Sequence, residues 1–339
     1  MIDHDDPRSA PPLRWGILGP GGIAGAFAWA VGAHTGSDVV AVGSRSPERA
    51  AGFAAQHGIG RVHAGYAELV GDPDVQAVYV ATPHSEHLCH CLLAIAAGKH
   101  LLVEKAFTRN AAEAERVLDA ARSAGVFVME AMWTRFLPHM VALREVVARG
   151  EIGEVVAVLA DHGQDMRHHP PTHRLHAPEL AGGALLDLGV YPVSFAHDVL
   201  GGPGHVRALG SLTPAGVDGQ VSVALGFGPT AQASLHTTLW ASSPTTAVVL
   251  GTTGRIEVAR RFFAPTTFDV VRADGSRWTY DGRVEGGLQF EAAEVARCVA
   301  AGAHESPLMS WEATLQVMRT MDEVRRQVGV RYPGEEPGR

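Results

Sequence analysis

The chain has 339 residues, of which 46% are hydrophobic and 19% are charged. This composition is typical of a soluble globular protein and excludes a disordered one. The net charge of −8 comes without any basic block, which argues against nucleic acid or an anionic membrane as a partner. The length suffices for two domains with substantial cores.

The sequence contains three cysteines and no uninterrupted apolar run long enough to span a bilayer. Three cysteines do not make a disulfide framework, so we expect a reducing, cytoplasmic setting. Residues 1–12 are acidic and proline-rich, which is typical of a disordered tail and not of a signal peptide.

The first expected strand leads into the pattern Gly19-x-Gly21-x-x-Ala24, after which a helix begins near Ile23. Gly19 permits a sharp turn, the missing Cβ of Gly21 lets the backbone approach a phosphate, and Ala24 keeps the helix close to the strand. N–H groups at the start of the helix then meet the negative charge of a pyrophosphate. The pattern predicts a dinucleotide-binding turn. Its expected contacts come from Gly19, Gly21, Gly22, Ile23 and Ala24.

The second expected strand, residues 38–43, is followed by Ser44 and Arg45 and not by the acidic residue that binds the ribose in an NAD enzyme. A hydroxyl and a guanidinium can bind a 2′-phosphate, which a carboxylate would repel. Ser44 and Arg45 therefore favour NADP over NAD. The alternative is that Arg45 is a solvated surface residue.

Strands and helices continue to alternate over about a hundred residues, which predicts a doubly wound parallel sheet. The expected helices are 47–57, 66–70, 84–98 and 110–125, and the expected strands are 75–82, 100–103 and 126–129. Ligands of such sheets gather at the carboxyl ends of the strands. We therefore expect cofactor contacts from the residues that close two of these strands, which are Thr82, Pro83, His84, Glu104 and Lys105.

One helix carries the segment His87–Leu88–Cys89–His90–Cys91. His87 and Cys91 are one turn apart and could share a metal ion, but no second cysteine pair completes a tetrahedral site. Core thiols on a buried helix are the better interpretation, so we predict no metal site.

Several motifs, in their order and spacing, resemble the glucose–fructose oxidoreductase/inositol dehydrogenase (Gfo/Idh/MocA) family. They are the glycine turn, Ala81–Thr82–Pro83–His84, Gly98–Lys99–His100, Glu104–Lys105 and the segments 130–138 and 182–192. The last two resemble the branch of dimeric dihydrodiol dehydrogenases and NADP-dependent D-xylose dehydrogenases. The resemblance extends from Leu13 to about Gln327.

The resemblance implies an α/β protein of two domains. A Rossmann domain that binds the dinucleotide is expected over residues 13–130. An α+β domain for substrate binding and dimerisation, with a large open, mostly antiparallel sheet, is expected over residues 131–330, and a tail over 331–339.

One position departs from the family, which usually has Glu-Lys-Pro, commonly with a cis Lys–Pro bond. Ala106 stands at the third position here. Either the Lys105–Ala106 bond is trans and Lys105 points in a slightly different direction, or the fold imposes a cis bond before alanine.

The second half begins with an expected helix over 138–150 and a strand over 154–160. A polar loop, residues 161–176, follows and contains five histidines and two aspartates. Its prolines and the absence of i, i+4 pairing argue against a preformed metal site. We expect a mobile loop over a substrate pocket, with Arg174 and His176 as contacts to hydroxyl groups. Trp133 and Arg135 are further candidates for substrate contact.

Gly182–Gly183 opens an expected helix in which Asp187 and Tyr191 are four residues apart and share one face. The alternative is a half-buried aromatic residue beside a capping carboxylate. The family resemblance implies catalytic roles for Lys105, Asp187 and Tyr191. A lysine ammonium beside a tyrosine favours the phenolate, which can accept a hydroxyl proton, while the aspartate binds a neighbouring hydroxyl or holds the lysine.

Successive strands without intervening helices occupy much of residues 206–258, which predicts an antiparallel sheet. Closing helices are expected over 287–302 and 311–327. One broad face of the sheet must be covered. Family members cover it with the same sheet of a second subunit, so we expect a homodimer or a higher oligomer.

The resemblance implies an NADP-dependent dehydrogenase, with NAD as the second candidate cofactor, acting on a small sugar, cyclic polyol or vicinal diol. Two alternatives remain. One is a glycosidase that keeps its nicotinamide bound, and the other is a regulatory protein of the same fold that senses the cofactor. Tight retention of the cofactor would favour the glycosidase, and binding without turnover would favour the sensor.

Overall fold

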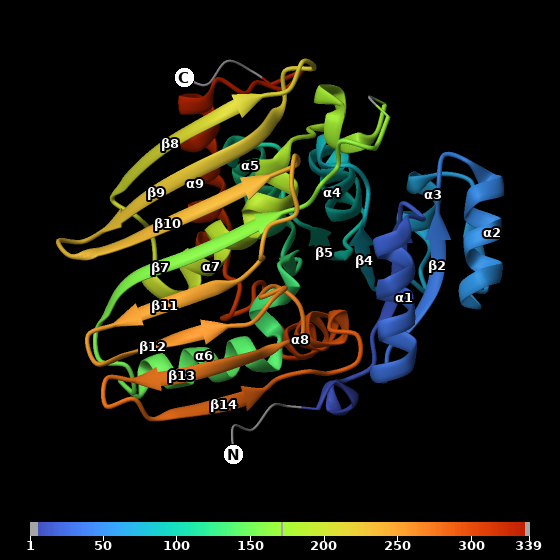
Figure 1. Cartoon of the computed structure of the whole chain (residues 1–339). Helices are drawn as coiled ribbons and strands as arrows, with labels where there is room; N and C mark the ends of the chain where they lie inside the picture. The colour runs from blue at the N-terminus through green and yellow to red at the C-terminus, as the bar shows by residue number, and fades with distance from the viewer. Residues whose placement is uncertain (1–5, 171, 336–339) are drawn as a thin grey trace. The chain divides into compact units, whose positions relative to one another are not determined.

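The computed structural model describes residues 6–170 and 172–335. The chain divides into two compact units (Figure 1). The first unit combines Asp3–Trp133 with Gly286–Thr314, and the second combines Thr134–Glu285 with Leu315–Arg339. The expected domain ranges did not anticipate that Gly286–Thr314 packs with the first unit.

A six-stranded parallel sheet forms the centre of the first unit, in the order β3-β2-β1-β4-β5-β6. This order is that of the doubly wound dinucleotide-binding fold, so the expected fold class is confirmed. Successive strands are added on one side of β1 up to β3 and on its other side from β4 onward, and such sheets bind ligands at the point between β1 and β4 where this order reverses. The strands are β1 (Arg14–Leu18), β2 (Asp38–Gly43), β3 (Arg61–His63), β4 (Ala77–Val80), β5 (His100–Glu104) and β6 (Val128–Ala131).

The helices of the first unit begin at side chains that the sequence marks as caps. Ser46 Oγ accepts a hydrogen bond from Arg49 N at 3.3 Å, and Asn110 Oδ1 accepts one from Glu113 N at 2.9 Å. These bonds satisfy N–H groups that have no partner inside the helix. The helices are α1 (Gly22–His34), α2 (Pro47–His57), α3 (Tyr66–Gly71), η2 (His84–Glu86), α4 (His87–Ala96), α5 (Ala111–Ala124) and α8 (Leu288–Ala300).

Both expected tails are partly structured. Pro7–Ser9 forms the short helix η1, and Ala10 is buried, so the N-terminal tail is shorter than the expected 1–12. Residues 1–5 lie outside the described range. At the other end Tyr332 is buried, so the expected tail over 331–339 is wrong as far as residue 335, and residues 336–339 are not described.

An eight-stranded sheet dominates the second unit, in the order β14-β13-β12-β11-β7-β10-β9-β8. Only the β7–β10 pair is parallel, which confirms the expected mostly antiparallel sheet. The last two strands were not anticipated from the sequence. The strands are β7 (Val155–Gly163), β8 (His205–Leu212), β9 (Asp218–Phe227), β10 (Ala231–Thr238), β11 (Ala247–Gly251), β12 (Gly254–Val258), β13 (Thr267–Arg272) and β14 (Arg277–Asp281).

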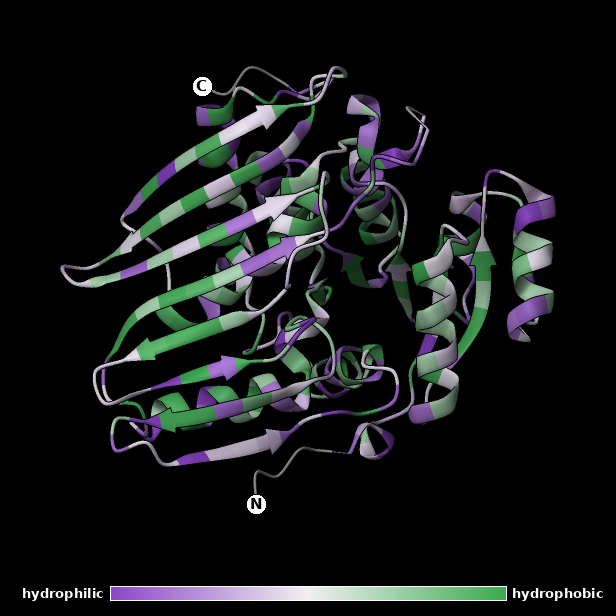
Figure 2. Ribbon diagram, in the orientation of Figure 1, coloured by the Kyte–Doolittle hydropathy of each residue, from purple (hydrophilic) through white to green (hydrophobic). Residues whose placement is uncertain are grey.

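Helices lie along one face of this sheet (Figure 1). Side chains alternate along the strands, as the hydropathy colours in Figure 2 show, because successive residues of a strand point to opposite faces. On β7, Val158 is buried whereas Leu159 is 42% exposed. The helices of this unit are α6 (Pro138–Ala148), α7 (Val190–Leu200) and α9 (Trp311–Val328), whose first residues belong to the first unit, and the shorter η3 (Trp133–Phe136), η4 (Arg174–His176), η5 (Pro178–Leu180) and η6 (Leu185–Gly189).

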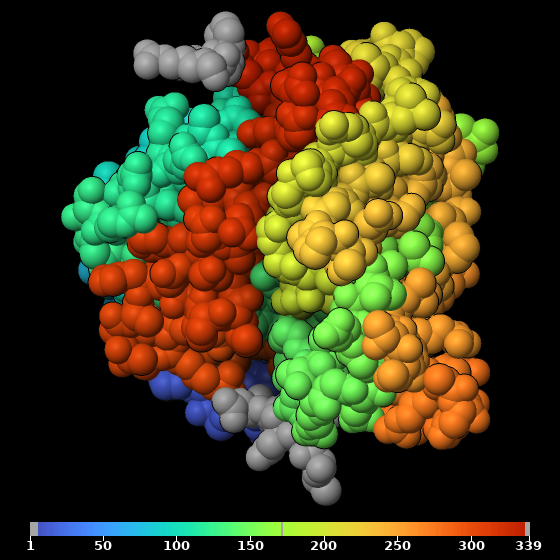
Figure 3. Space-filling model, turned by 90° about the vertical axis from the view of Figure 1, so that its left-hand side faces the viewer, coloured from blue at the N-terminus to red at the C-terminus, as the bar shows by residue number. Residues whose placement is uncertain are grey.

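The C-terminal end of α9, drawn in red in Figure 3, lies beside the outermost strand β8. The Gln327 side chain accepts a hydrogen bond from Ala208 N at 2.8 Å and donates one to Val206 O at 2.9 Å. This pairing satisfies part of a sheet edge that would otherwise be open. No helix in the described part of the chain is long and apolar enough to cross a membrane.

Candidate functional site

The glycine turn lies between β1 and α1, as expected. Gly19 has φ of 94°, and a Cβ there would lie 2.9 Å from Ala81 O, so only glycine fits. A Cβ on Gly21 or Gly22 would meet nothing within 4 Å, so the backbone at the start of α1 faces open space. Because the first N–H groups of a helix attract anions, this arrangement fits a pyrophosphate.

A pocket of about 540 Å³ opens beside this turn. Its lining includes Gly21 and Gly22 and, from the first turn of α2, Arg49. A guanidinium in a pocket that also contains a phosphate-binding turn fits the 2′-phosphate of NADP. Sequence reasoning missed Arg49, although it stands four residues after Arg45. Arg45 is exposed, whereas Ser44 is buried and its Oγ accepts a hydrogen bond from Ser46 N at 3.1 Å.

The residues that follow β4 and β5 contact one another in the first unit. His84 Nε2 lies 3.1 Å from Lys105 O, within hydrogen-bond distance. Lys105 N donates to Glu104 Oε2 at 3.2 Å, and the Tyr79 hydroxyl donates to the other oxygen of Glu104. The Lys105–Ala106 peptide bond is cis, which is the second of the two arrangements expected for it.

His87 connects these two loops. Its Nε2 lies 2.7 Å from Thr82 O and its Nδ1 lies 3.1 Å from Phe107 O. Glu130 Oε1 accepts a hydrogen bond from Phe107 N at 3.1 Å, so Phe107 is held at both its backbone polar groups. His87 is fully buried, and this burial lowers its pKa. Since both ring nitrogens face backbone carbonyls, His87 does not form a metal site with Cys91.

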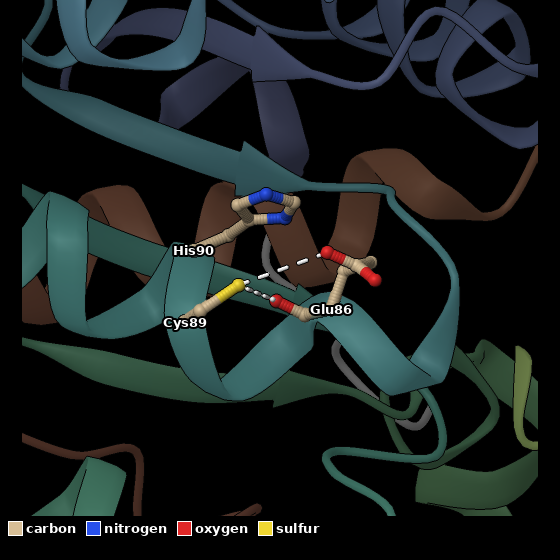
Figure 4. Close-up of side chains that lie close together, drawn as sticks. All are labelled: Glu86, Cys89 and His90. Carbon is tan, nitrogen blue, oxygen red and sulfur yellow. Dashed lines mark hydrogen bonds between the residues drawn. The ribbon is translucent and has the colours of Figure 1, made fainter. Parts of the chain in front are cut away.

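A different group converges on α4, where ligand atoms of Glu86, Cys89 and His90 lie within 4.8 Å of one another (Figure 4). The Cys89 thiol donates to Glu86 O at 3.1 Å, and His90 Nδ1 lies 3.0 Å from Thr82 Oγ1. Burial and the nearby Glu86 raise the pKa of Cys89, so the thiol stays protonated at neutral pH. Burial lowers the pKa of His90 to about 4. These partners account for the group without a metal ion, and the prediction of no metal site stays.

The cysteine prediction is half right. Cys91 is buried, and burial raises the pKa of its thiol, as a core thiol requires. Cys89 is exposed, so the expectation that both thiols lie in the core is wrong for it.

In the second unit, Asp187 lies on the π-helical turn Leu185–Gly189, and α7 then carries Tyr191. Such turns are frequent at functional sites. The chain enters this segment through Gly182, where a Cβ would lie 2.6 Å from Arg174 O, so the close backbone approach requires glycine.

Arg174 binds Asp187 through two hydrogen bonds, Nη1 to Oδ1 at 3.0 Å and Nη2 to Oδ2 at 3.2 Å. We expected Arg174 to contact a substrate hydroxyl, but the structure pairs it with the proposed catalytic carboxylate. His176 Nε2 lies 3.2 Å from Met166 O, so this histidine has a partner within its own loop.

The Tyr191 ring belongs to an aromatic group. It stacks on Phe263 with ring centroids 4.6 Å apart, and His162 stacks on the same phenylalanine at 4.4 Å. Tyr191 itself is largely buried. Sequence reasoning missed Phe263, and it noted His162 only as one histidine of the polar loop.

The two remaining candidates differ in their environment. Arg135 is buried, its Nε donates to Ser194 Oγ at 3.1 Å, and its guanidinium lies 3.8 Å from Asp198. These internal partners fix the Arg135 side chain, and its role in substrate contact stays a prediction. Trp133 is partly exposed at the end of the first unit, and its role in substrate contact stays a prediction.

Comparison with known proteins shows two matching family models. The model described as "Oxidoreductase family, NAD-binding Rossmann fold" matches residues 13–132, and that of the GFO/IDH/MocA C-terminal domain matches residues 140–257. The trans-1,2-dihydrobenzene-1,2-diol dehydrogenase of Mus musculus is 37% identical over 334 residues, which cover 95% of this chain and 98% of the relative.

Two further proteins show similar coverage. The D-xylose 1-dehydrogenase (NADP(+)) of Hypocrea jecorina is 35% identical over 372 residues, covering 95% of this chain and 93% of the relative. A crystal structure of a 3-ketoreductase from Actinomadura kijaniata with NADP and TDP-benzene is similar with a TM-score of 0.83. It is 28% identical and covers 94% of this chain and 98% of its own.

Proposed function

Because the chain belongs to the GFO/IDH/MocA family of oxidoreductases, we propose that it transfers hydride between NADP and a CH–OH group of a sugar, cyclic polyol or vicinal diol. One observation carries the cofactor assignment. The open backbone of Gly21 and Gly22 shares a pocket with the guanidinium of Arg49. An arginine at this place can bind the 2′-phosphate, a group that NAD lacks.

The first unit binds the cofactor in this proposal. The start of α1 binds the pyrophosphate, while Ser44, Arg45 and Arg49 bind the 2′-phosphate. The residues after β4 and β5 approach the nicotinamide end, because ligands of parallel sheets lie at the carboxyl ends of the strands. They are Thr82, Pro83, His84, Glu104 and Lys105. Bound NADP supplies the group that accepts or gives the hydride.

Tyr191 is the proposed acid/base. Oxidation of a CH–OH group releases a proton as well as a hydride, and the phenolate of Tyr191 accepts that proton. Lys105 supplies a positive charge that favours the phenolate. Asp187, oriented by Arg174, accepts a hydrogen bond from a neighbouring substrate hydroxyl and so places the reacting carbon.

The surroundings of Tyr191 support a substrate with several hydroxyls. Phe263 and His162 are both buried and stack on one another next to the Tyr191 ring, so they pack behind the phenol and fix its position. The Arg174–Asp187 pair adds polar groups that bind hydroxyls. The relatives named above act on a dihydrodiol and on D-xylose, as their names state, which fits this class.

We also propose a homodimer through the second unit's sheet. Leu159 and Leu209 lie on the same face and are 42% and 79% exposed. The row in register with Leu159 runs through Ser234 and Ala224 to Arg207 on β8, and Leu209 lies two residues further along that strand. This face therefore combines small and apolar side chains with a charged one. A face of this kind favours burial against a second copy. The free cysteines Cys89, Cys91 and Cys298 support a reducing, cytoplasmic location.

A screen of NADP reduction over aldoses, inositols and trans-dihydrodiols tests the function. We expect oxidation of at least one class by the purified chain, and a loss of about 10²- to 10⁴-fold in kcat in Tyr191→Phe with NADP affinity nearly unchanged. Tyr280→Phe, a change on β14, is the matched control.

Retained turnover in Tyr191→Phe would remove this residue as the acid/base. Cofactor that stays bound through purification, together with cleavage of glycosides, would favour the glycosidase. NADP binding without any turnover would favour the sensor.

A further inference from the structure

A buried carboxylate lies directly against the backbone turn that precedes Asp187. Asp218, the first residue of β9, is fully buried. Its Oδ2 accepts a hydrogen bond from Leu185 N at 2.6 Å. A Cβ on Gly183 would lie 2.2 Å from Asp218 Oδ1, so the carboxylate packs against the turn with no space between them.

A second buried side chain holds the same turn from the C-terminal segment. The Tyr332 hydroxyl donates to Gly182 O at 2.7 Å. The Arg325 guanidinium lies 4.3 Å from the centre of the Tyr332 ring. Glu335 accepts hydrogen bonds from Arg325 and, at 2.9 Å, from Tyr332 N, so the segment that carries Tyr332 is itself fixed.

Backbone carbonyls of the preceding residues also hold the turn. Gly182 N donates to Ala177 O at 3.1 Å, and Gly183 N donates to Leu175 O at 2.9 Å. The turn is therefore held by two backbone carbonyls and by two side chains. Buried backbone N–H and C=O groups need hydrogen-bond partners. When one partner is lost, the other group is left unsatisfied, and the free energy of unfolding falls.

We propose that Asp218 and Tyr332 are positioning residues for Asp187 and Tyr191. They fix the start of the helical segment that carries both residues, without touching the substrate. The C-terminal segment is thereby a support of the active site and not only a covering of the core. This inference rests on the catalytic roles proposed above for Asp187 and Tyr191.

The geometry explains why both contacts are needed. Asp218 places an acceptor oxygen at the N-terminal end of a helical segment, where the first N–H groups have no partner inside the helix. Tyr332 binds the carbonyl three residues earlier, which the Asp218 carboxylate cannot bind. Together they fix one N–H and one C=O of the turn, and thus its rotation as well as its position.

Hydrogen exchange and kinetics on three variants test the proposal. We expect Tyr332→Phe and Asp218→Ala each to speed amide exchange in the peptide 183–191 by about tenfold. In the same variants kcat falls by about tenfold, while NADP affinity stays within about twofold. Asp218→Asn keeps an oxygen for Leu185 N, so it retains most of the protection and of kcat. Tyr280→Phe, on the opposite edge of the sheet, changes neither quantity.

Unchanged exchange of the peptide 183–191 in both Tyr332→Phe and Asp218→Ala would overturn the proposal. So would faster exchange spread evenly over the second unit, since that pattern means a general loss of stability. If Asp218→Ala does not fold, the exchange rates of Tyr332→Phe and Asp218→Asn still test the proposal. The exchange measurement needs no substrate, so a wild-type protein without turnover would refute the proposed function and leave this test intact.

Discussion

Arg174 and Asp187 form a bidentate ion pair, with hydrogen bonds of 3.0 and 3.2 Å between the guanidinium nitrogens and the carboxylate oxygens. The arginine side chain is 50% exposed and that of the aspartate 8%. The pair connects the polar loop, residues 161–176, to the π-helical turn. Because a bidentate pair fixes the plane of the carboxylate, the loop determines the orientation of Asp187 and of its remaining lone pairs.

Replacement of Arg174 by alanine tests this connection. We expect kcat/KM for the substrate to fall by about 10- to 100-fold, because charge-assisted hydrogen bonds contribute about 1.5–3 kcal/mol and Asp187 loses its orientation. NADP affinity should not change. Arg167→Ala is the control, since Arg167 pairs with Asp165 in the same loop but is exposed. Equal losses in the two variants would mean that the loop as a whole, and not this pair, supports turnover.

The 2′-phosphate assignment is tested by Arg49→Ala and Arg45→Ala. Removal of a guanidinium that binds the phosphate should weaken the binding of NADP by about 10- to 100-fold, with little effect on the binding of NAD. The larger effect is expected for Arg49, which lines the pocket beside the glycine turn. Dissociation constants for the two cofactors, measured by fluorescence titration, give the comparison. A parallel loss for NAD and NADP would place both arginines away from the phosphate.

The dimer proposal predicts a shift in oligomeric state. Leu159→Arg places a charge in the centre of the exposed sheet face, where a buried unpaired charge would be costly. We expect a monomer of unchanged circular dichroism in sedimentation or light-scattering measurements. Val62→Arg, at an apolar position of β3 that is 43% exposed, is the control. A dimer that survives Leu159→Arg would show that the sheet face is not the interface.

Much of the fold could be predicted because its signals are local. Ser46 and Asn110 mark the starts of α2 and α5, and the Gly19 turn marks the sheet's first crossover. The alternation along β9 and β10 likewise predicts strands with one buried face. In all these cases the physical cause lies within a few residues of the element that it determines.

The contacts that organise the candidate site could not be predicted because they join distant positions. Leu185 and Asp218 are 33 residues apart, and Gly182 and Tyr332 are 150 residues apart. Nothing in the composition of residues 331–335 distinguishes a tail from a packed segment, and a tail is predicted there from the sequence. His87 is similar, because one of its two carbonyl partners, Phe107 O, lies 20 residues further along the chain.

The pH dependence of stability tests the buried state of Asp218. Burial raises the pKa of Asp218 to about 7 from its ordinary value of 3.8, although the Leu185 N–H and the Arg325 charge act in the opposite direction. Between these values the folded chain keeps a proton that the unfolded chain releases. The free energy of unfolding that this group contributes therefore falls as the pH rises from about 4 to about 7.

Asp218→Asn removes this dependence, so the variant should gain stability relative to the wild type as the pH rises from 5 to 8. The gain approaches roughly 2–4 kcal/mol, measured from thermal or urea unfolding at each pH. Asp269→Asn is the control, and its stability difference from the wild type should stay constant between pH 5 and pH 8. Hydrogen bonds from Arg277 and Thr279 lower the pKa of Asp269, so its ionised form stabilises the fold above pH 4. A stability difference between Asp218→Asn and the wild type that is the same at pH 5 and pH 8 would show that Asp218 ionises in the folded chain as it does in water.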